Sequence, residues 1–280
     1  MKILVTGAGG MLGTDFVRAA RYWNHDIVGY THAELDITDA EAVWRACVRE
    51  KPDVVVNCAA YTDVDGAEGD LEGASRVNTE GARFVALGAA EVGVSVVYPS
   101  TDYVFDGTKA APYIESDPTR PLSVYGQTKA AGEAETAAAN QRFYIVRSSW
   151  LFGTGSRNFV DTMLALGQDQ GSVVVVRDQV GCPTYTAHLA DAIVRLIATT
   201  AFGIHHIAGG GECSWYEFAE EIFRQAALDV RMMSMTSTEL SRPATRPAYS
   251  VLATERSEAI YLPEWQEGLS SYLAERAVAT

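Results

Sequence analysis

The chain opens on KILVTGAGGMLG, residues 2–13, in which a short apolar, β-branched run passes directly into a glycine-rich turn. The glycines at positions 7, 10 and 13 follow a G-x-x-G-x-x-G spacing. Gly7 permits a tight turn, Gly10 lets the backbone approach a pyrophosphate, and Gly13 lets the next helix pack close to the strand. A pyrophosphate in such a loop contacts free N–H groups at the positive end of that helix. Because the spacing lies between a strand signal and a helix signal, it predicts a dinucleotide-binding loop.

Strand and helix signals alternate outward from this loop. Apolar runs typical of buried strands occupy Ile3–Val5, Ile27–Tyr30, Val54–Asn57, Val94–Tyr98 and Tyr144–Val146. Alanine-rich stretches with helical spacing lie between them, at residues 12–22, 39–50, 71–92 and 127–139. This alternation predicts an α/β fold with a Rossmann-type, doubly wound parallel sheet that carries helices on both faces.

The pattern loosens after residue 150. A strand signal at residues 173–176 is followed by helical stretches at 187–199 and 214–227, the latter with Ser214 as its N-cap. A chain of 280 residues fits one large α/β domain with a small companion lobe. We therefore expect an NAD(P)-binding Rossmann domain over residues 1–150, with later returns of the chain, and a smaller C-terminal, mainly substrate-binding lobe over residues 151–280.

The end of the second strand bears on the choice of nicotinamide cofactor. This strand ends in VGYTH, residues 28–32, and Glu34 and Asp36 come only after it. An acidic residue at the tip would bind both ribose hydroxyls and favour NAD. Its absence removes repulsion against a 2′-phosphate, which His32 is placed to face. We expect NADPH, with NADH as the alternative.

A second motif lies near the end of the fourth strand. Thr101 follows this strand, and SVYGQTK, residues 123–129, opens an alanine-rich helix. Tyr125 and Lys129 are four residues apart, so they share one helix face. A phenol titrates at about 10, and a nearby ammonium group lowers that pKa, which prepares the phenol to donate a proton to a carbonyl oxygen. The Thr101 hydroxyl at a strand end can bond the same oxygen. These three residues are the predicted catalytic group of a carbonyl reduction by hydride transfer.

Composition narrows the partners. The formal net charge is −14, and a negative surface repels nucleic acid and anionic lipid, so we expect neither as a partner. No apolar run approaches the ~20 residues of a membrane helix, and no signal peptide precedes the first strand, so we expect a cytoplasmic protein. The four cysteines are widely spaced and form no C-x-x-C pair, which favours neither a disulfide framework nor a zinc site.

Several further segments have the pattern of a known family. They are LDITD (35–39), NCAAYTDVD (57–65), STDYVFDG (100–107), RSSWLFG (147–153), NFV (158–160), DQVGCPT (178–184) and RPAYS (246–250). Over Lys2 to at least Leu252, the chain resembles an extended short-chain dehydrogenase/reductase. Within that superfamily it is most similar to the dTDP-4-dehydrorhamnose reductases, and the segments 100–107 and 147–153 are the most specific signals.

The resemblance implies roles by position. Cofactor contacts are implied for Gly7, Gly10, Met11, Leu12, Gly13, Asp36, Ile37, Ala59, Ala60, Tyr61, Thr62, Tyr125 and Lys129. Substrate contacts are implied for Thr62, Val64, Thr101, Asp102, Tyr103, Trp150, Asn158 and Arg246. Among these, Arg246 would bind the substrate diphosphate, because a guanidinium matches phosphate geometry.

The chain also departs from the family pattern. Cys58 stands where an alanine is usual, and Ser123 stands where an asparagine is often found. Some members form homodimers bridged by magnesium-bound carboxylates, and Asp15 is a candidate ligand. The sequence offers no full ligand set, so the metal is left undecided and a homodimer is left open.

The reaction that the resemblance implies is reduction of the 4-keto group of dTDP-4-dehydro-L-rhamnose to give dTDP-L-rhamnose. One alternative is another nucleotide-sugar 4-ketoreductase, with the same chemistry and a different pocket. A second is a non-catalytic NADP-binding regulatory subunit, against which the intact Thr101, Tyr125 and Lys129 argue. A sugar dehydratase is disfavoured because Asp102-Tyr103, and not an Asp-Glu pair, follows the threonine.

Overall fold

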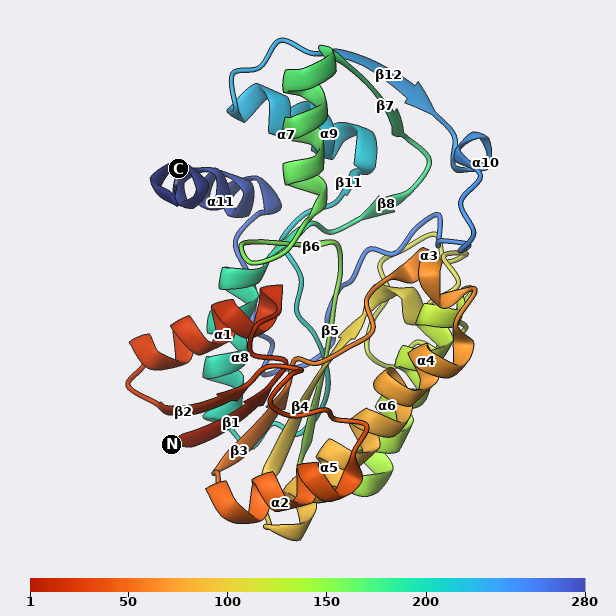
Figure 1. Ribbon diagram of the computed structural model, residues 1–280. Helices are drawn as coiled ribbons and strands as arrows, with labels where there is room; N and C mark the ends of the chain where they lie inside the picture. Colours follow the sequence, from red (N-terminus) through yellow and green to blue (C-terminus); the bar gives the residue numbers. More distant parts are fainter. Residues whose placement is uncertain (280) are drawn as a thin grey trace.

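A six-stranded parallel sheet forms the centre of the computed structural model, which describes residues 1–279 (Figure 1). Its strand order is β10-β5-β4-β3-β1-β2. The strands are β1 (Lys2–Thr6), β2 (Asp26–Tyr30), β3 (Val54–Asn57), β4 (Ser95–Thr101), β5 (Phe143–Ser148) and β10 (Gly203–His206). Every pairing between them is parallel, and the chain order reverses between β1 and β3. The predicted doubly wound Rossmann-type fold is thus confirmed.

Helices cover both faces of this sheet. One face carries α1 (Met11–Tyr22) and α8 (Thr186–Ile197), and the other carries α2 (Ala40–Glu50), α5 (Ala82–Glu91) and α6 (Val124–Ala139) (Figure 1). Alternation along β1 divides its side chains between the two layers: Ile3 and Val5 belong to the core under α1 and α8, and Leu4 to the core under α2 and α5. Strands buried on both faces explain the continuous apolar runs in the sequence.

The helix predicted over residues 71–92 is interrupted. It begins as α4 (Leu71–Ser75), passes through one π-helical segment, η1 (Arg76–Gly81), and continues as α5. The π segment buries Asn78, whose side chain bonds the backbone of Tyr61 and the hydroxyl of Thr128. Periodicity alone predicts one helix here, because the wider turn arises from contacts with distant residues.

A second core lies beyond the carboxyl ends of the strands (Figure 1). The lobe around it contains α7 (Phe159–Gln170), α9 (Trp215–Gln225), α11 (Trp265–Ala279), β7 (Ser172–Val176) and β12 (Arg231–Met235). Two short elements follow strands of the main sheet: α3 (Val64–Ala67) and η2 (Asp102–Val104). The other short elements come later in the chain: β6 (Leu151–Phe152), β8 (Val180–Gly181), β9 (Thr184–Tyr185), β11 (Cys213–Ser214) and α10 (Ser237–Leu240). The chain returns to the main sheet through α8 and β10, so residues 186–206 pack with the Rossmann-type domain. Ser214 caps α9, as predicted, within a capping box.

Two further features concern the helices as possible membrane spans and the state of the cysteines. No helix within residues 1–279 combines the length and the apolar composition needed to cross a bilayer. All four cysteines are free thiols.

A buried ion pair fastens α6 to the sheet. The guanidinium of Arg147 on β5 donates from Nε and Nη2 to the two carboxylate oxygens of Glu133 on α6, at 2.9 and 2.7 Å. Ser100 on β4 donates to the same carboxylate at 2.5 Å. The Arg147 and Glu133 side chains are only 3% and 7% exposed. Removing one partner would leave the other charge buried without compensation.

We expect Arg147→Met to lower the free energy of unfolding by about 3–5 kcal/mol, because the Glu133 carboxylate loses its charge partner inside the protein. Urea unfolding of the purified variant measures the change. The matched control is Arg195→Met, since Arg195 pairs with Asp191 at 3.0 Å on a surface where both side chains are 44% exposed. That pair is worth about 0–1 kcal/mol. Equal losses in the two variants would contradict the assigned role of the buried pair.

Candidate active site

Most of the predicted site residues lie where the parallel strands of the main sheet end, whereas Asn158 and Arg246 come from the C-terminal part of the chain. β1 leads into the glycine loop, β3 into residues 58–62, β4 into Thr101 and β5 into Trp150. The carboxyl ends of neighbouring parallel strands share one edge of the sheet, and ligands bind at the point where the strand order reverses. This edge faces the second lobe (Figure 1).

The glycine loop has the geometry of an anion cradle. Gly7 has a φ of +64°, and a Cβ there would lie 2.5 Å from the backbone nitrogen of Ala59. A Cβ on Gly13 would lie 2.2 Å from the carbonyl oxygen of Gly7. Both positions therefore exclude any side chain. Gly10 is the N-cap of α1, whose first turn has no side-chain cap and no acidic residue, so its N–H groups are available to a pyrophosphate.

The residues expected beside the adenine lie after β2. Asp36 is exposed, and its carboxylate accepts from the backbone N–H and hydroxyl of Thr38 at 2.9 and 2.8 Å. The bond from the Thr38 N–H is the main cause that holds the pKa of Asp36 below its ordinary value, and the nearby charges of His32 and Arg76 add to it. Ile37 is buried. No carboxylate ends β2 itself, but the Glu34 carboxylate accepts from the N–H and the hydroxyl of Thr31, the residue after the strand, at 2.8 Å each. The loop after β2 therefore does bring an acidic group to the tip of this strand.

Asn78 was not predicted from the sequence, yet its side chain connects two segments of the candidate site. Its Oδ1 accepts from the Tyr61 N–H at 2.9 Å, and its Nδ2 donates to the Tyr61 carbonyl at 3.0 Å. The same amide donates to the hydroxyl of Thr128 at 3.2 Å. Asn78 thus ties the segment after β3 to the helix that carries Tyr125 and Lys129. Its only sequence signal is a polar residue within an alanine-rich predicted helix.

The predicted catalytic residues meet between β4 and α6. Thr101 ends β4 and is 7% exposed, and Lys129 is 3% exposed. Lys129 Nζ donates to the Pro99 carbonyl at 2.7 Å and lies 4.0 Å from the centroid of the Tyr98 ring. The Thr101 hydroxyl bonds the phenol of Tyr125, which is half-buried. A strand-end hydroxyl, a phenol and an ammonium group therefore lie at one edge of the sheet.

Burial dominates the titration of these groups. It raises the pKa of Tyr125 to about 12, the charge of Asp102 acts in the same direction, and the bond from Thr101 opposes both. It also lowers the pKa of Lys129 to about 7, against the influence of Glu133. The sequence predicted a lowered phenol pKa. That expectation is wrong for this structure, because the Lys129 ammonium group bonds the Pro99 carbonyl and desolvation of the Tyr125 phenol dominates its pKa.

Asp102 and Tyr103 form the first turn after β4. Asp102 is 1% exposed, and its carboxylate oxygens contact the hydroxyls of Thr101 and Ser250. The Tyr103 ring packs edge-on against Tyr125, with centroids 6.0 Å apart.

Arg246, expected to bind a diphosphate, bonds a carboxylate here. Its two terminal nitrogens donate to the two carboxylate oxygens of Asp65 at 3.0 and 2.9 Å. Asp65 lies on α3, just after the predicted cofactor segment Ala59–Thr62. Thr62 is exposed and Val64 is half-buried. Arg246 therefore spans from the C-terminal segment to the Rossmann layer.

Trp150 and Asn158 lie in the second lobe. Trp150 adopts a φ of +48°, and its ring stacks on Trp215 with centroids 3.5 Å apart. Asn158 is the N-cap of α7, and its amide nitrogen donates to the Gly153 carbonyl at 2.9 Å and to the Tyr272 hydroxyl at 3.0 Å. The structure thus gives the Asn158 side chain a capping and packing role.

Asp15, the candidate magnesium ligand, is already paired within the chain. Its buried carboxylate bonds Arg18 at 2.8 Å and also accepts from the Thr186 hydroxyl. Burial raises the pKa of Asp15, with the two partners opposing. Residues 1–279 contain no group of three or more His, Cys, Asp or Glu side chains that could hold a metal ion.

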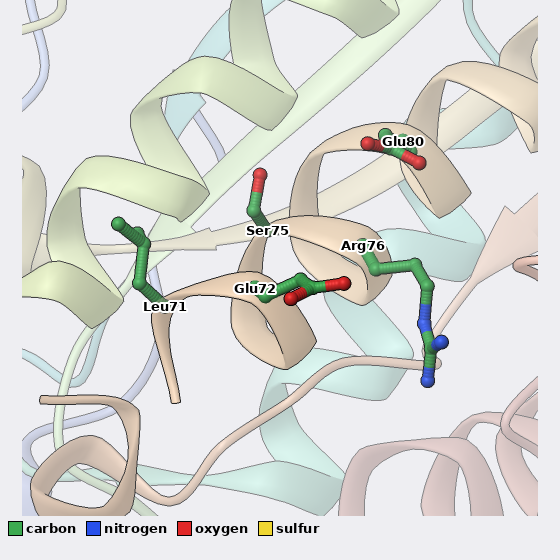
Figure 2. Close-up of a pocket in the computed structure, with 5 residues that line it drawn as sticks. All are labelled: Leu71, Glu72, Ser75, Arg76 and Glu80. Carbon is green, nitrogen blue, oxygen red and sulfur yellow. The ribbon is translucent and has the colours of Figure 1, made fainter. Parts of the chain in front are cut away.

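A surface hollow is lined by residues of α4 and η1, and one of them, Arg76, is close enough to act on Asp36. Figure 2 shows its lining residues, with the Arg76 side chain extended away from Leu71. The hollow contains none of the predicted catalytic residues, and it is bounded by one stretch of helix (Figure 2). We therefore place the chemistry at the carboxyl edge of the sheet.

Comparison with known proteins agrees with this geometry. The family model described as "RmlD substrate binding domain" matches residues 1–278. The chain is 43% identical to a dTDP-4-dehydrorhamnose reductase of Streptomyces griseus, covering 95% of this chain and 91% of that protein. It is 42% identical to a dTDP-4-keto-6-deoxy-D-glucose reductase of Streptomyces niveus, covering 89% and 87%. It also matches a dTDP-4-dehydrorhamnose reductase of Bacillus anthracis, solved in complex with NADP, with a TM-score of 0.95, 37% identity and coverage of 98% and 99%. A family match over nearly the whole length, together with relatives about 40% identical over most of the chain, means that this chain belongs to the RmlD substrate binding domain family of dTDP-4-dehydrorhamnose reductases.

Proposed function

We propose that this protein reduces the 4-keto group of a dTDP-linked deoxysugar, converting dTDP-4-dehydro-L-rhamnose to dTDP-L-rhamnose with NADPH. The observation that carries the proposal is the convergence of Thr101, Tyr125 and Lys129 at the strand edge that also holds the glycine loop. A regulatory subunit that only bound the cofactor would have no use for this buried catalytic group. The first test follows the absorbance of reduced nicotinamide and identifies the sugar product, with NADPH and NADH in parallel.

The cofactor would lie along the carboxyl edge from α1 to α6. The loop Gly7–Gly13 would hold the pyrophosphate, Asp36 and Ile37 would flank the adenine, and the segment from Ala59 to Thr62 would line the path to the nicotinamide. When bound, the cofactor supplies a hydride to carbon 4 of the sugar. A preference for NADPH is supported by the relative from Bacillus anthracis that was solved in complex with NADP, although the Glu34 carboxylate lies against Thr31 at the tip of β2.

The side chains of this chain would manage the proton. Tyr125 would donate its phenolic proton to the carbonyl oxygen as negative charge develops there. Thr101 would donate a hydrogen bond to the same oxygen. Lys129, one turn along α6, would hold the nicotinamide ribose, and its ammonium charge would stabilise the phenolate that Tyr125 becomes.

The substrate would occupy the space between the sheet edge and the second lobe. Tyr103 and Trp150 are the aromatic faces proposed for the sugar, with Thr62 and Val64 beside it, and Asp102 and Asn158 complete the proposed set. Arg246 would bind the diphosphate. A strongly acidic protein needs such a local cation to accept an anionic ligand.

A second candidate is reduction of a different dTDP-4-keto sugar. The relative named as a dTDP-4-keto-6-deoxy-D-glucose reductase supports it, because its identity to this chain nearly equals that of the dTDP-4-dehydrorhamnose reductase. The two candidates share the catalytic group and differ in the pocket. Reduction rates with both keto sugars distinguish them. The expected cytoplasmic location and the homodimer remain predictions.

We expect Tyr125→Phe to lower kcat about 100- to 10,000-fold, because the carbonyl oxygen loses its proton donor. The Kd for NADPH, measured by fluorescence, is expected to stay close to wild type. Tyr22→Phe is the control, since Tyr22 is 85% exposed and is not one of the proposed site residues. Undiminished turnover in the Tyr125 variant would overturn the proposed mechanism.

The pH dependence of NADPH binding tests Lys129. Burial lowers its pKa to about 7, so the ammonium form is present below that pH and is lost above it. If only the charged form binds the cofactor, the Kd for NADPH rises about tenfold between about pH 6 and pH 8. Lys129→Met is expected to bind weakly with a flatter profile, whereas Lys51→Met, at an exposed position, should keep the wild-type profile. A Lys129 variant with the full wild-type pH dependence would exclude this role.

Arg246→Lys tests the proposed diphosphate contact. A lysine cannot reproduce the two-pronged bond, so we expect the KM for the nucleotide sugar to rise about tenfold while the Kd for NADPH is unchanged. Arg242→Lys is the control, because Arg242 is 52% exposed and lies 3.9 Å from the same Asp65. A KM that does not change in Arg246→Lys would remove Arg246 from the substrate site.

A further inference from the structure

We propose that Tyr98 is a positioning residue whose aromatic ring holds the Lys129 ammonium group charged at the carboxyl edge of the sheet, with the side away from the ring free to donate to the cofactor ribose. The inference rests on the proposed binding of a nicotinamide cofactor. It assigns a task to a side chain that lies outside the predicted catalytic group. Tyr98 belongs to β4, three residues before Thr101.

The contacts of Lys129 are few for a buried ammonium group. The residue is 3% exposed, and within residues 1–279 its Nζ donates one hydrogen bond, to the Pro99 carbonyl at 2.7 Å. The same Nζ lies over the Tyr98 ring, 4.0 Å from the centroid. A buried charge needs a partner, and the face of an aromatic ring attracts a cation most strongly where water is excluded. The Tyr98 ring therefore offsets part of the cost of burying this charge.

The carboxylate one turn along α6 is engaged elsewhere. Glu133 accepts from Nε and Nη2 of Arg147 and from the Ser100 hydroxyl. Its charge favours the ammonium form of Lys129, but the hydrogen bonds of the described chain include none between the two side chains. Glu133 thus acts on Lys129 from a distance, whereas the Tyr98 ring is in direct contact with it.

The other titratable groups around Lys129 are neutral. Cys58 faces it from the segment after β3, and burial raises the pKa of that thiol to about 12. Burial also raises the pKa of the phenols of Tyr98 on β4 and Tyr125 on α6. Desolvation lowers the pKa of Lys129 itself, so its charged form depends on the contacts that remain. Those contacts are the Pro99 carbonyl and the Tyr98 ring, two consecutive residues of one strand.

The Tyr98 ring is itself fixed between two helical segments. Tyr98 is 1% exposed, and its hydroxyl donates to the Asn78 carbonyl in η1 at 3.0 Å. α6 carries Gly132 where the hydroxyl approaches, and a Cβ there would lie 2.4 Å from Tyr98 Oη. Glycine inside a helix is less favourable than alanine, and room for the Tyr98 hydroxyl gives this glycine a structural reason. The ring therefore has little freedom to leave Lys129.

This arrangement directs the remaining donors of Lys129. An ammonium group has three N–H donors and no acceptor. The Pro99 carbonyl takes one donor, and the Tyr98 ring covers one side of the group. The side away from the ring can then donate to the hydroxyl oxygens of the cofactor ribose. Both contacts come from β4, so the strand that ends in Thr101 also aims Lys129.

NMR of labelled lysine side chains measures the charge state of Lys129 directly. The chain has four lysines, Lys2, Lys51, Lys109 and Lys129, so the spectrum is simple, and Lys129→Met assigns the signal. In wild type the ε-methylene protons of Lys129 should resonate upfield, because the ring current of Tyr98 acts on them. We expect Tyr98→Leu to abolish this upfield shift and to lower the titration midpoint of Lys129 by about 1 pH unit, since the cation loses its aromatic partner. Tyr98→Phe, which retains the ring, should preserve both.

Two comparisons separate the ring from a general effect of the core. Tyr98→Phe removes the hydroxyl that bonds Asn78, so a role in packing alone would disturb Lys129 in this variant as well. Tyr144→Leu is the matched control, since Tyr144 on the neighbouring strand is also 1% exposed but packs in the core under α1 and α8. An unchanged midpoint in Tyr98→Leu, or a midpoint lowered as much in Tyr98→Phe or Tyr144→Leu, would overturn the proposal.

A fluorinated ring tests the same contact if Tyr98→Leu does not fold. Trifluorophenylalanine incorporated at position 98 keeps the shape of the ring, while fluorine withdraws electrons from its face and weakens the attraction for a cation. The Lys129 midpoint should then fall below that of Tyr98→Phe. Equal midpoints for the two rings would contradict the inference.

Binding of NADPH connects the charge of Lys129 to function without any keto sugar. At about pH 7 we expect the Kd for NADPH to be about fivefold higher in Tyr98→Leu than in Tyr98→Phe, because a smaller fraction of Lys129 is charged. Equal affinities would remove Tyr98 from cofactor binding. If the NMR and binding results hold while wild type reduces no keto sugar, the proposed reduction fails and the role of Tyr98 stands.

Discussion

The buried bond between Arg147 and Glu133 is the constraint on which the site depends. It joins β5 to α6 and takes in Ser100 on β4, so one helix is held against two strands by charge-assisted hydrogen bonds. Glu133 lies one turn beyond Lys129 on α6, and Ser100 immediately precedes Thr101 on β4. An ion pair that lies outside the proposed catalytic residues therefore holds the helix of Tyr125 and Lys129 against the strand that ends in Thr101. Such a pair adds little net stability. Breaking it would leave one buried charge without a partner, and this cost holds α6 in register on the sheet.

A second set of close contacts joins the cofactor edge together. Gly7 approaches the backbone of Ala59, and Gly13 approaches the carbonyl of Gly7, so the loop after β1 packs closely against the segment after β3. Asn78 connects this segment to α6 through its bonds to Tyr61 and Thr128. Asn78 lies within the π-helical turn of η1, where its side chain is buried.

The two lobes meet through polar side chains as well as through packing. Arg246 bonds Asp65, and Ser250 bonds Asp102, so two residues of the C-terminal segment end on the Rossmann layer beside the catalytic group. The site is thus complete only when both lobes are in place. Arg246 in particular is available to an anionic ligand only by sharing or exchanging its carboxylate partner, which suits a diphosphate better than a single weak acceptor.

The sequence by itself determined the strands and most helices, and it predicts the catalytic group, because the glycine spacing, the apolar runs and the Tyr125–Lys129 interval are local patterns. It also contained the family resemblance that the comparisons confirm. The tertiary structure alone decided which distant groups meet: β10 as the sixth strand, Asn78 under Tyr61, and Ser250 on Asp102. It also reversed the expected shift in the pKa of Tyr125. The physical reason is the same in each case, since burial and long-range hydrogen bonds depend on how the layers pack and leave no periodic trace along the chain.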